Sequence, residues 1–259
     1  MRPLDQILHA KRQELEQQRA AETLDELTRR INDSPPVADF RSAIHVEERL
    51  SLIAEIKRSS PSRGKIADIG VAELAQAYDN SSAAAISVLT DSHFEGAIEH
   101  ISKAKSATSK PVLRKDFILD TYQVYQARAY GADAVLLIAS ILEGDKMAEL
   151  LATCHELGLA ALVESHTAED VNKIPNNAVI FGVNNRDLSS EDLTIDMNTM
   201  PTVLPSIPQD KTIVCESGIH TREDVEKVET LERVNAILVG TSVIGSGDPQ
   251  QKIAELLGI

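Results

Sequence analysis

Eight short runs of β-prone residues, separated by longer stretches with helical patterning, are the feature that most restricts how this chain can fold. The runs begin 18–34 residues apart, which is the length of one strand and its crossover. They cover residues 52–56, 84–89, 111–117, 134–139, 160–164, 178–184, 212–217 and 236–240. Helical patterning is clearest in residues 71–80, 121–131, 147–158 and 221–229. Strands that alternate with helical crossovers pair in parallel, so the pattern predicts an α/β fold built on a parallel sheet.

Two arrangements of such a sheet have to be weighed. Eight units in 259 residues, with no shift in composition that would mark a second domain, favour a single closed (β/α)8 barrel, the TIM barrel, over residues 51–259. The alternative is an open, doubly wound sheet. That fold normally carries a G-x-G-x-x-G turn after its first strand, whereas residues 59–64 read SSPSRG.

Residues 1–50 precede the first predicted strand. Apolar residues recur at roughly helical spacing through residues 4–31, among many charged and amide side chains. We therefore expect one helix there, which ends at the run Asn32-Asp33-Ser34-Pro35-Pro36. We interpret the segment as a helical extension packed on the barrel or on a partner subunit; it could also dock a neighbouring enzyme of a pathway.

Composition excludes several classes of function. The chain has 26 basic and 40 acidic residues and a formal net charge of −14, which argues against coating a nucleic acid or binding an anionic membrane surface. No apolar run approaches the roughly 18 residues that a membrane helix needs. The two cysteines, Cys154 and Cys215, form no disulfide framework and no zinc-like cluster, which indicates a reducing cytoplasm and no structural metal.

Charged side chains fall at the predicted carboxyl ends of several strands, where TIM barrels carry their chemistry. Alternate strand residues share a face, so Glu55 and Lys57 point into the barrel mouth together with Ile53. The same alternation places Lys115 beside Leu113 and Phe117, Glu164 beside Leu162, and Glu216 beside Val214, with Asn184 and Arg186 after the sixth strand. Partly buried charges persist when they are paired. We therefore expect three cations (Lys57, Lys115, Arg186) to balance three carboxylates (Glu55, Glu164, Glu216).

Two glycine-containing turns follow the last two strands, at residues 216–219 and 239–242. In TIM barrels the loops at these positions commonly bind phosphate through backbone N–H groups. Ser60 could add a hydroxyl donor from the first loop, or could simply be a turn residue before Pro61. The polar, positive segment 59–65 is either a cover over an anionic ligand or a solvated loop.

Taken together, these stretches resemble the indole-3-glycerol phosphate synthase family over essentially the whole chain. The resemblance rests on residues 54–62, 86–96, 113–117, 132–142, 162–167, 182–188, 216–219 and 238–242. It implies a barrel enzyme of tryptophan biosynthesis, a carboxy-lyase that converts 1-(2-carboxyphenylamino)-1-deoxyribulose 5-phosphate to indole-3-glycerol phosphate. It implies no metal and no organic cofactor, and a small substrate that carries a phosphate and a carboxylate.

The resemblance also implies roles for particular residues. Lys115 is the expected general acid in ring closure, Glu164 an acid–base group in dehydration, and Lys57 a contact to the substrate carboxylate or an aid to loss of hydroxide. Residues that orient the substrate and the lysines are Glu55, Asn184, Glu216 and Ser217. The phosphate is expected at Ser60, Gly218, Gly240 and Thr241. The remaining substrate-binding residues are Phe94, Phe117 and Leu188 around the aryl group, with Arg186 and Leu238.

Two other functions compete with this one. A related isomerase that acts on phosphoribosyl anthranilate would pair a cysteine with an aspartate, but Cys154 falls in a predicted helix and Cys215 is expected to face outward. A barrel without catalytic activity that binds a metabolite or a partner is disfavoured by the presence of Lys57, Lys115 and Glu164. Three histidines, His93, His155 and His166, have no partner at a recognisable spacing, and we expect them at the surface or behind the site.

Overall fold

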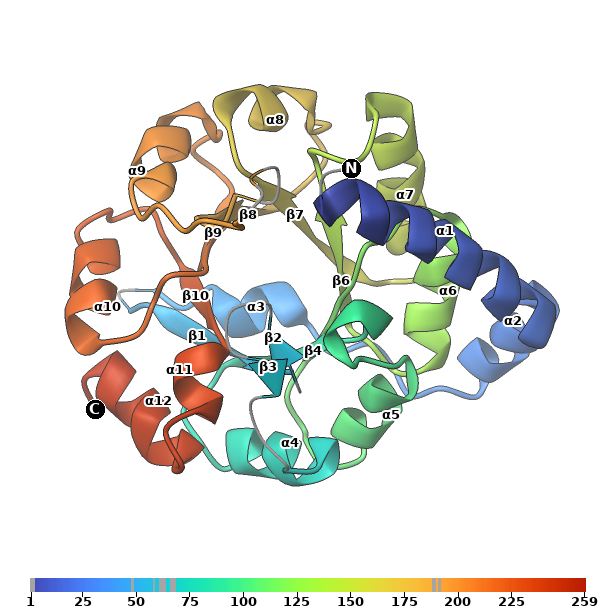
Figure 1. The fold of residues 1–259 in the computed structure, drawn as a ribbon, viewed down its shortest axis with the longest axis horizontal. Helices are drawn as coiled ribbons and strands as arrows, with labels where there is room; N and C mark the ends of the chain where they lie inside the picture. The colour runs from blue at the N-terminus through green and yellow to red at the C-terminus, as the bar shows by residue number, and fades with distance from the viewer. Residues whose placement is uncertain are drawn as a thin grey trace.

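Eight parallel strands close into a barrel at the centre of the molecule (Figure 1). The computed structural model describes residues 3–47, 49–57, 59–60, 64–65, 69–187, 190 and 192–259. Around the barrel the strands are ordered β1-β10-β9-β8-β7-β6-β5-β4. Their bounds are β1 Ser51–Ile56, β4 Ala85–Leu89, β5 Val112–Lys115, β6 Ala134–Ile138, β7 Ala160–Ser165, β8 Ile180–Asn184, β9 Thr212–Glu216 and β10 Ala236–Val239. All eight predicted strands are present, and the prediction of a (β/α)8 barrel is confirmed.

Alternation along each strand divides the core into two parts. On β1, Leu52, Ala54 and Ile56 pack outward against the surrounding helices. Ile53 points into the barrel, where it joins inward residues of the other strands, among them Leu113 and Val214. The predicted assignment of inward and outward faces is therefore confirmed. Aliphatic side chains fill the inward face along the middle of the strands. The inward-facing polar side chains therefore lie at the strand ends.

Helices surround the barrel between successive strands (Figure 1). The four predicted helices are confirmed as α4 Val71–Asp79, α6 Thr121–Ala129, α7 Gly144–Glu156 and α10 Arg222–Glu229. The others are α5 Glu99–Lys105, α8 Ala168–Lys173, α9 Thr199–Val203, α11 Thr241–Ile244 and α12 Pro249–Leu257, with 3-10 turns η1 Ser92–Phe94 and η2 Leu204–Ser206. Most of this second group span fewer than two helical turns, which is too short for a periodic signal in the sequence.

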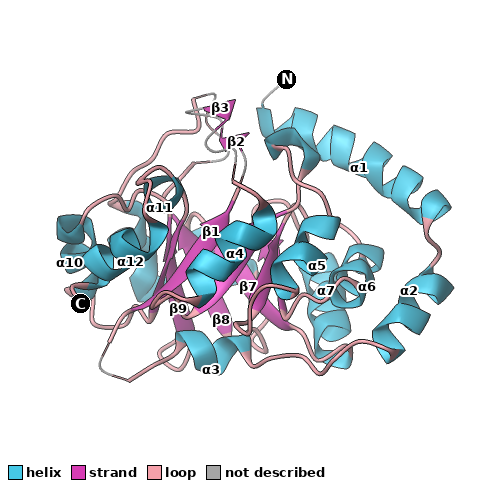
Figure 2. Ribbon diagram, turned by 90° about the horizontal axis from the view of Figure 1, so that it is seen from below, coloured by secondary structure: helices cyan, strands magenta, loops and turns pink. Residues whose placement is uncertain are grey.

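The expectation of one helix over residues 4–31 is wrong, because the segment forms two helices. They are α1 Pro3–Ala21 and α2 Leu24–Asn32. Thr23 is extended and forms a capping box with Glu26, in which each side chain meets the other residue's backbone N–H. This local arrangement satisfies the free N–H groups of a new helix start, and the chain changes direction there (Figure 2). The predicted stop is confirmed, because α2 ends at Asn32.

A third short helix, α3 Phe40–Ile44, follows α2 and was not predicted. It lies at the end of the barrel opposite β2 and β3 (Figure 2). Phe40 and Ile44 are buried there against inward residues such as Ile53 and Leu113. This helix closes the amino end of the barrel with apolar side chains, which leaves the carboxyl end as the open one.

Part of the first loop is a two-stranded antiparallel hairpin, β2 Ser59–Ser60 and β3 Gly64–Lys65. Residues 61–63 of the predicted cover lie outside the described residues, so its role stays a prediction. In the part of the chain that the structure describes, no helix has the length and apolarity required to cross a membrane.

Candidate active site

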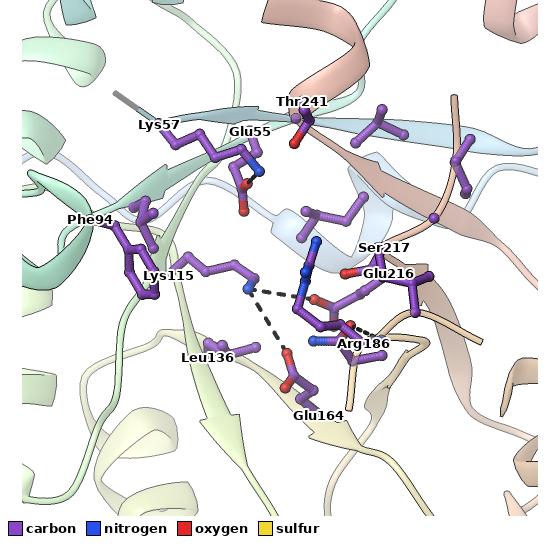
Figure 3. A pocket seen from close by; sticks show the side chains of 18 of the residues that line it. Glu55, Lys57, Phe94, Lys115, Leu136, Glu164, Arg186, Glu216, Ser217 and Thr241 are labelled. Atoms are coloured by element: carbon purple, nitrogen blue, oxygen red, sulfur yellow. Dashed lines mark hydrogen bonds and ion pairs between the residues drawn. The ribbon is translucent and has the colours of Figure 1, made fainter. Parts of the chain in front are cut away.

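A pocket opens at the carboxyl ends of the barrel strands and takes lining residues from all eight strands or the loops after them (Figure 3). Fourteen of the sixteen predicted site residues line it: Glu55, Lys57, Phe94, Lys115, Phe117, Glu164, Asn184, Arg186, Glu216, Ser217, Gly218, Leu238, Gly240 and Thr241. Leu188 lies outside the described residues, as does the side chain of Ser60, whose backbone is in β2. Residues that are distant in the sequence thus converge on one cavity.

Lys115, the last residue of β5, points its amine into the pocket between two glutamates (Figure 3). Its Nζ atom lies 4.0 Å from Oε2 of Glu164 and 3.9 Å from Oε2 of Glu216. Burial by itself would lower the pKa of Lys115, but the negative potential of Glu164, Glu55 and Glu216 outweighs it and raises that pKa. Lys115 is therefore held as a protonated ammonium in a largely enclosed position.

Glu216 behaves differently from the other carboxyl groups. Burial, and after it the neighbouring charge of Glu164, raises the pKa of Glu216 well above its ordinary value. Lys115 nevertheless lies within ion-pair distance of both glutamates, and Lys57 pairs with Glu55. The carboxyl oxygens of Glu164 and Glu216 are buried and have no hydrogen-bond partner among the described residues. Such groups are costly in a core, so their presence indicates a site for a polar ligand.

Glu55 and Lys57 form an ion pair on the opposite side of the pocket, with 2.8 Å between Nζ and Oε1. Burial would raise the pKa of Glu55, but Lys57 and then Lys115 outweigh it and lower that pKa. A side chain at position 240 would occupy the space of this pair: a Cβ there would lie 2.7 Å from Oε1 of Glu55 and 3.2 Å from Nζ of Lys57. Gly240 therefore lets the chain just after β10 pass close to the pair without displacing it.

Arg186 lies at the edge of the pocket on the segment after β8. Its backbone N–H donates to Oδ1 of Asn184 at 3.0 Å, and its guanidinium donates to the carbonyl of Leu193 at 3.1 Å. Burial lowers the pKa of Arg186, although Glu55 opposes that effect. Arg186 therefore adds positive potential to the pocket while its orientation is set by backbone groups.

The turn after β9 has a backbone conformation that few residues adopt. Ser217 and Gly218 have φ angles of 66° and 87°, both in the left-handed region. At Gly218 a Cβ would also lie 2.3 Å from Sδ of Met197, so both conformation and space favour glycine. The turn after β10 continues directly into α11, with Gly240 as the N-cap. Both predicted glycine turns therefore lie at the pocket, with backbone groups at its rim.

One wall of the pocket is apolar. Phe94 comes from η1 after β4, and Phe117 follows β5 and packs with the barrel interior. Leu136 and Ile138 of β6 also line the pocket and were not singled out from the sequence. They occupy alternate positions of a predicted strand, so the alternation used for the charged residues could have found them.

His166 was given no specific role by the sequence, yet its Nε2 atom lies 3.5 Å from Oε1 of Glu164. The sequence spacing could have predicted this contact, because residues 164 and 166 share one face of an extended strand end. His155 is exposed on α7, as expected. The ring of His93 is partly exposed, and its Nδ1 atom lies 3.9 Å from Oδ1 of Asp91.

A closed barrel with a protonated lysine and carboxyl groups at its carboxyl end defines a (β/α)8-barrel enzyme equipped for acid–base chemistry. Comparison with known proteins gives the particular family. The model of the family "Indole-3-glycerol phosphate synthase" matches residues 4–256. The chain belongs to this family.

Individual relatives agree with the family match. The chain is 42% identical over 259 residues to the indole-3-glycerol phosphate synthase of Neisseria meningitidis serogroup B, with 98% of each chain covered. It is 39% identical over 258 residues to that of Desulforamulus reducens, with 98% of this chain and 96% of the relative covered. Among solved structures, 3-hexulose-6-phosphate synthase from Salmonella typhimurium aligns with a TM-score of 0.65 at 15% identity, over 81% of this chain and 97% of that one. That likeness concerns the fold alone.

Proposed function

We propose that this chain is a carboxy-lyase that converts 1-(2-carboxyphenylamino)-1-deoxyribulose 5-phosphate to indole-3-glycerol phosphate, CO2 and water, in tryptophan biosynthesis. The observation that carries the proposal is the largely enclosed ammonium of Lys115 between Glu164 and Glu216, in a chain that belongs to the synthase family. Its free cysteines, both buried, are consistent with a reducing cytoplasm.

Lys115 is the general acid of the first step. The ring carbon that bears the carboxylate attacks the ribulose carbonyl carbon, and the ammonium donates a proton to the carbonyl oxygen as negative charge develops there. The raised pKa of Lys115 supports this role, because it keeps the donor loaded with its proton before substrate binds. Enclosure within the barrel strengthens the interaction, since the effective dielectric constant there is lower than in water.

The second step is loss of CO2. The bond between the ring carbon and the carboxylate breaks, and its electron pair restores the aromatic ring. Lys57 is a candidate contact for the carboxylate, and its ion pair with Glu55 at 2.8 Å holds it at the mouth. The other assignment for Lys57 is to assist loss of hydroxide in the third step.

The third step is dehydration, in which the hydroxyl made in ring closure leaves as water and the adjacent position loses a proton. Glu164 is the acid–base group that we assign to this step. Its buried carboxyl oxygens face Lys115 and have no hydrogen-bond partner among the described residues, so they are available to the substrate. Glu216, whose pKa is raised by burial, lies 3.9 Å from the amine of Lys115, and with Glu55, Asn184 and Ser217 it orients the substrate and the lysines.

Substrate binding divides between the two sides of the pocket. We assign the phosphate to the turns that contain Gly218, Gly240 and Thr241, with Ser60 from the first loop, because backbone N–H groups and a helix start favour an anion. We assign the aryl group to Phe94 and Phe117, and we assign Leu188 to the same group of aryl contacts. Leu238 lines the pocket below the turns, and Arg186 adds positive potential for an anionic substrate.

The competing isomerase reaction needs a cysteine as acid or base, and neither cysteine lines the pocket. Cys154 lies in α7, and Cys215 packs outward on β9 with the helices. Burial raises the pKa of both thiols to about 12. Each thiol therefore stays protonated and away from the substrate.

The test is an indole fluorescence assay, which is favourable because the chain contains no tryptophan. Replacing Lys115 by Met removes the proton donor, so ring closure should fall by about 10²–10⁴-fold while far-UV circular dichroism stays unchanged. Glu164→Gln should accumulate a decarboxylated intermediate or slow the final step. Lys146→Met, which changes a lysine on the outer face of α7, is the matched control. Full turnover by the Lys115 variant would contradict the assignment.

A further inference from the structure

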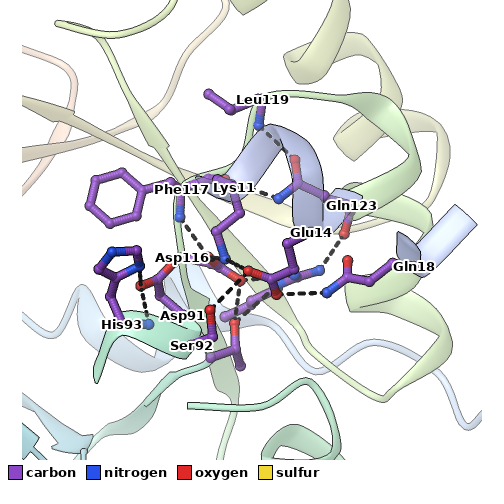
Figure 4. Close-up of polar contacts among 12 residues, drawn as sticks. Lys11, Glu14, Gln18, Asp91, Ser92, His93, Asp116, Phe117, Leu119 and Gln123 are labelled. Carbon is purple, nitrogen blue, oxygen red and sulfur yellow. Dashed lines mark hydrogen bonds and ion pairs between the residues drawn. The ribbon is translucent and has the colours of Figure 1, made fainter. Parts of the chain in front are cut away.

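A lysine of the N-terminal helix is buried beside the active site (Figure 4). The side chain of Lys11, on α1, is 3% exposed. Its Nζ atom lies 2.7 Å from Oδ2 of Asp91, 2.9 Å from Oδ1 of Asp116 and 2.9 Å from Oε2 of Glu14. Glu14 belongs to the same helix, but Asp91 follows β4 and Asp116 follows β5. One ammonium therefore joins α1 to the carboxyl ends of two neighbouring barrel strands.

Asp116 connects this ammonium to the catalytic side of the barrel. It directly follows Lys115 and lines the same pocket. Its Oδ1 atom accepts the backbone N–H of Phe117 at 2.8 Å, and its Oδ2 atom accepts the hydroxyl of Thr90 at 2.6 Å and the guanidinium of Arg114 at 2.9 Å. The carboxylate of Asp116 is thus hydrogen-bonded to the backbone of one pocket residue, Phe117, and directly follows another, Lys115.

Asp91 connects the same ammonium to the aryl wall. Its side chain is fully buried and caps the 3-10 turn η1, where it accepts the backbone N–H of His93 at 3.0 Å. That turn ends at Phe94, which lines the pocket. The carbonyl of Asp91 also accepts the N–H groups of Phe94 at 3.1 Å and Gly96 at 2.9 Å. Asp91 thus determines the path of the loop that presents the aromatic ring.

The two aspartates depend on the lysine electrostatically. Burial raises the pKa of Asp91 in spite of Lys11, and the nearby charge of Asp116 adds to that rise. For Asp116, Arg114 and then Lys11 outweigh burial and hold its pKa well below the ordinary value. Without the ammonium, two buried carboxyl groups would lie close together, and Arg114 pairs with Asp116 but is not paired with Asp91. A buried charge that loses its partner is strongly destabilising locally.

We propose that Lys11 is a positioning residue for the reaction: it clamps the ends of β4 and β5 so that Lys115 and the ring of Phe94 face the substrate together. Lys11 does not line the pocket, so it acts through Asp91 and Asp116. The expected effect on kcat rests on the proposed function. The expected effect on the order of residues 90–96 and 115–117 does not, and it can be measured without any turnover.

The experiment compares Lys11→Met with Arg19→Met. Arg19 also attaches α1 to the barrel, through Asp120, but that pair is partly exposed and neither residue lines the pocket. We expect Lys11→Met to lower kcat by at least about tenfold while Arg19→Met stays within twofold of wild type. Amide hydrogen exchange of residues 90–96 and 115–117 should accelerate in the Lys11 variant only. The double variant Lys11→Met/Asp91→Asn, which removes one of the stranded charges, should recover several-fold in kcat.

Lys11→Arg keeps the charge but cannot reproduce all three short contacts. We therefore expect it to lower kcat and to accelerate exchange in the two segments less than Lys11→Met does. If the Met variant does not fold, the Arg variant is used for both measurements. The inference is overturned if kcat of the folded variant stays within twofold of wild type or if exchange in the two segments is unchanged. It is also overturned if activity falls only in proportion to the unfolded fraction. Absence of turnover in wild type would instead contradict the proposed function, and the exchange data would still decide the clamp.

Discussion

At the scale of single residues, the arrangement of the active site depends on positions where no side chain is present. Gly182 lies inside the barrel on β8, next to Glu164 and Val214 in the strand register. A Cβ atom there would lie 2.2 Å from Oε1 of Glu216 and 3.3 Å from Cδ1 of Leu162. The missing side chain therefore makes the space in which Glu216 reaches Lys115.

Replacing Gly182 by Ala should displace the carboxyl group of Glu216, the flexible end of a side chain, more than it disturbs the backbone. We expect kcat to fall by about 10- to 100-fold, because small displacements of catalytic groups have effects of this size. The free energy of unfolding should fall by about 1–3 kcal/mol. Indole fluorescence and urea denaturation measure the two effects. Gly144→Ala on α7, where a Cβ meets nothing within 4 Å, is the control, and wild-type kcat in Gly182→Ala would refute this account.

At the scale of elements, the N-terminal segment illustrates why periodicity alone misplaces helix ends. The apolar spacing continues through residues 4–31, but the capping box of Thr23 and Glu26 starts a new helix within it. Helix α2 then packs Leu27, which is fully buried, against Tyr122 of α6. The helix start is set by hydrogen bonds of two side chains, a short-range effect that a count of apolar positions does not register.

The cap can be tested on its own. Thr23→Ala removes the hydroxyl that accepts the N–H of Glu26, and we expect it to lower the free energy of unfolding by about 1 kcal/mol. The control is Thr28→Ala within α2, at another exposed threonine, whose hydroxyl donates to the carbonyl of Leu24. Because alanine has the higher helix propensity, this change should alter the free energy of unfolding by only a few tenths of a kcal/mol. Urea midpoints of the two variants give the comparison. Equal losses would show that the box does not stabilise α2.

At the scale of the whole molecule, buried ionisable groups make stability depend on pH. Glu216 has a folded-state pKa raised well above its unfolded value by burial and by Glu164. The folded state then binds more protons than the unfolded state at pH values above about 4.5, so this group's contribution to stability falls as the pH rises. It is fully present below the unfolded pKa and is lost as the pH rises through the folded pKa.

Glu216→Gln imitates the neutral acid and removes this titration. We therefore expect the free energy of unfolding of wild type, minus that of the variant, to decrease between pH 5 and pH 8. Its slope cannot exceed about 1.4 kcal/mol per pH unit, the value for one proton. Urea denaturation across this range measures it. Glu149→Gln, on the exposed side of α7, controls for removing a charge from a chain of net charge −14. A difference that rises with pH would show that the pKa of Glu216 is not raised.

Much of the fold and most of the pocket lining could be predicted from the sequence, because both depend on short-range patterns. A strand alternates its faces every two residues, so the inward position of Lys115, Glu164 and Glu216 and the outward position of Cys215 follow from counting along each strand. Parallel strands of a barrel end at one rim, and that rule brings their polar termini together without any knowledge of distances.

Only the tertiary structure decided how those groups act on one another. Distances through space and burial determine three features: the raised pKa of Glu216, the clamp of Lys11 between Asp91 and Asp116, and the contact of His166 with Glu164. Electrostatic potential and desolvation are set by every neighbour at once, whatever its position along the chain. The pattern within each strand could therefore predict which residues meet. The pKa shifts of those residues, and the contact of α1 that holds two of the strand ends, could be known only from the folded chain.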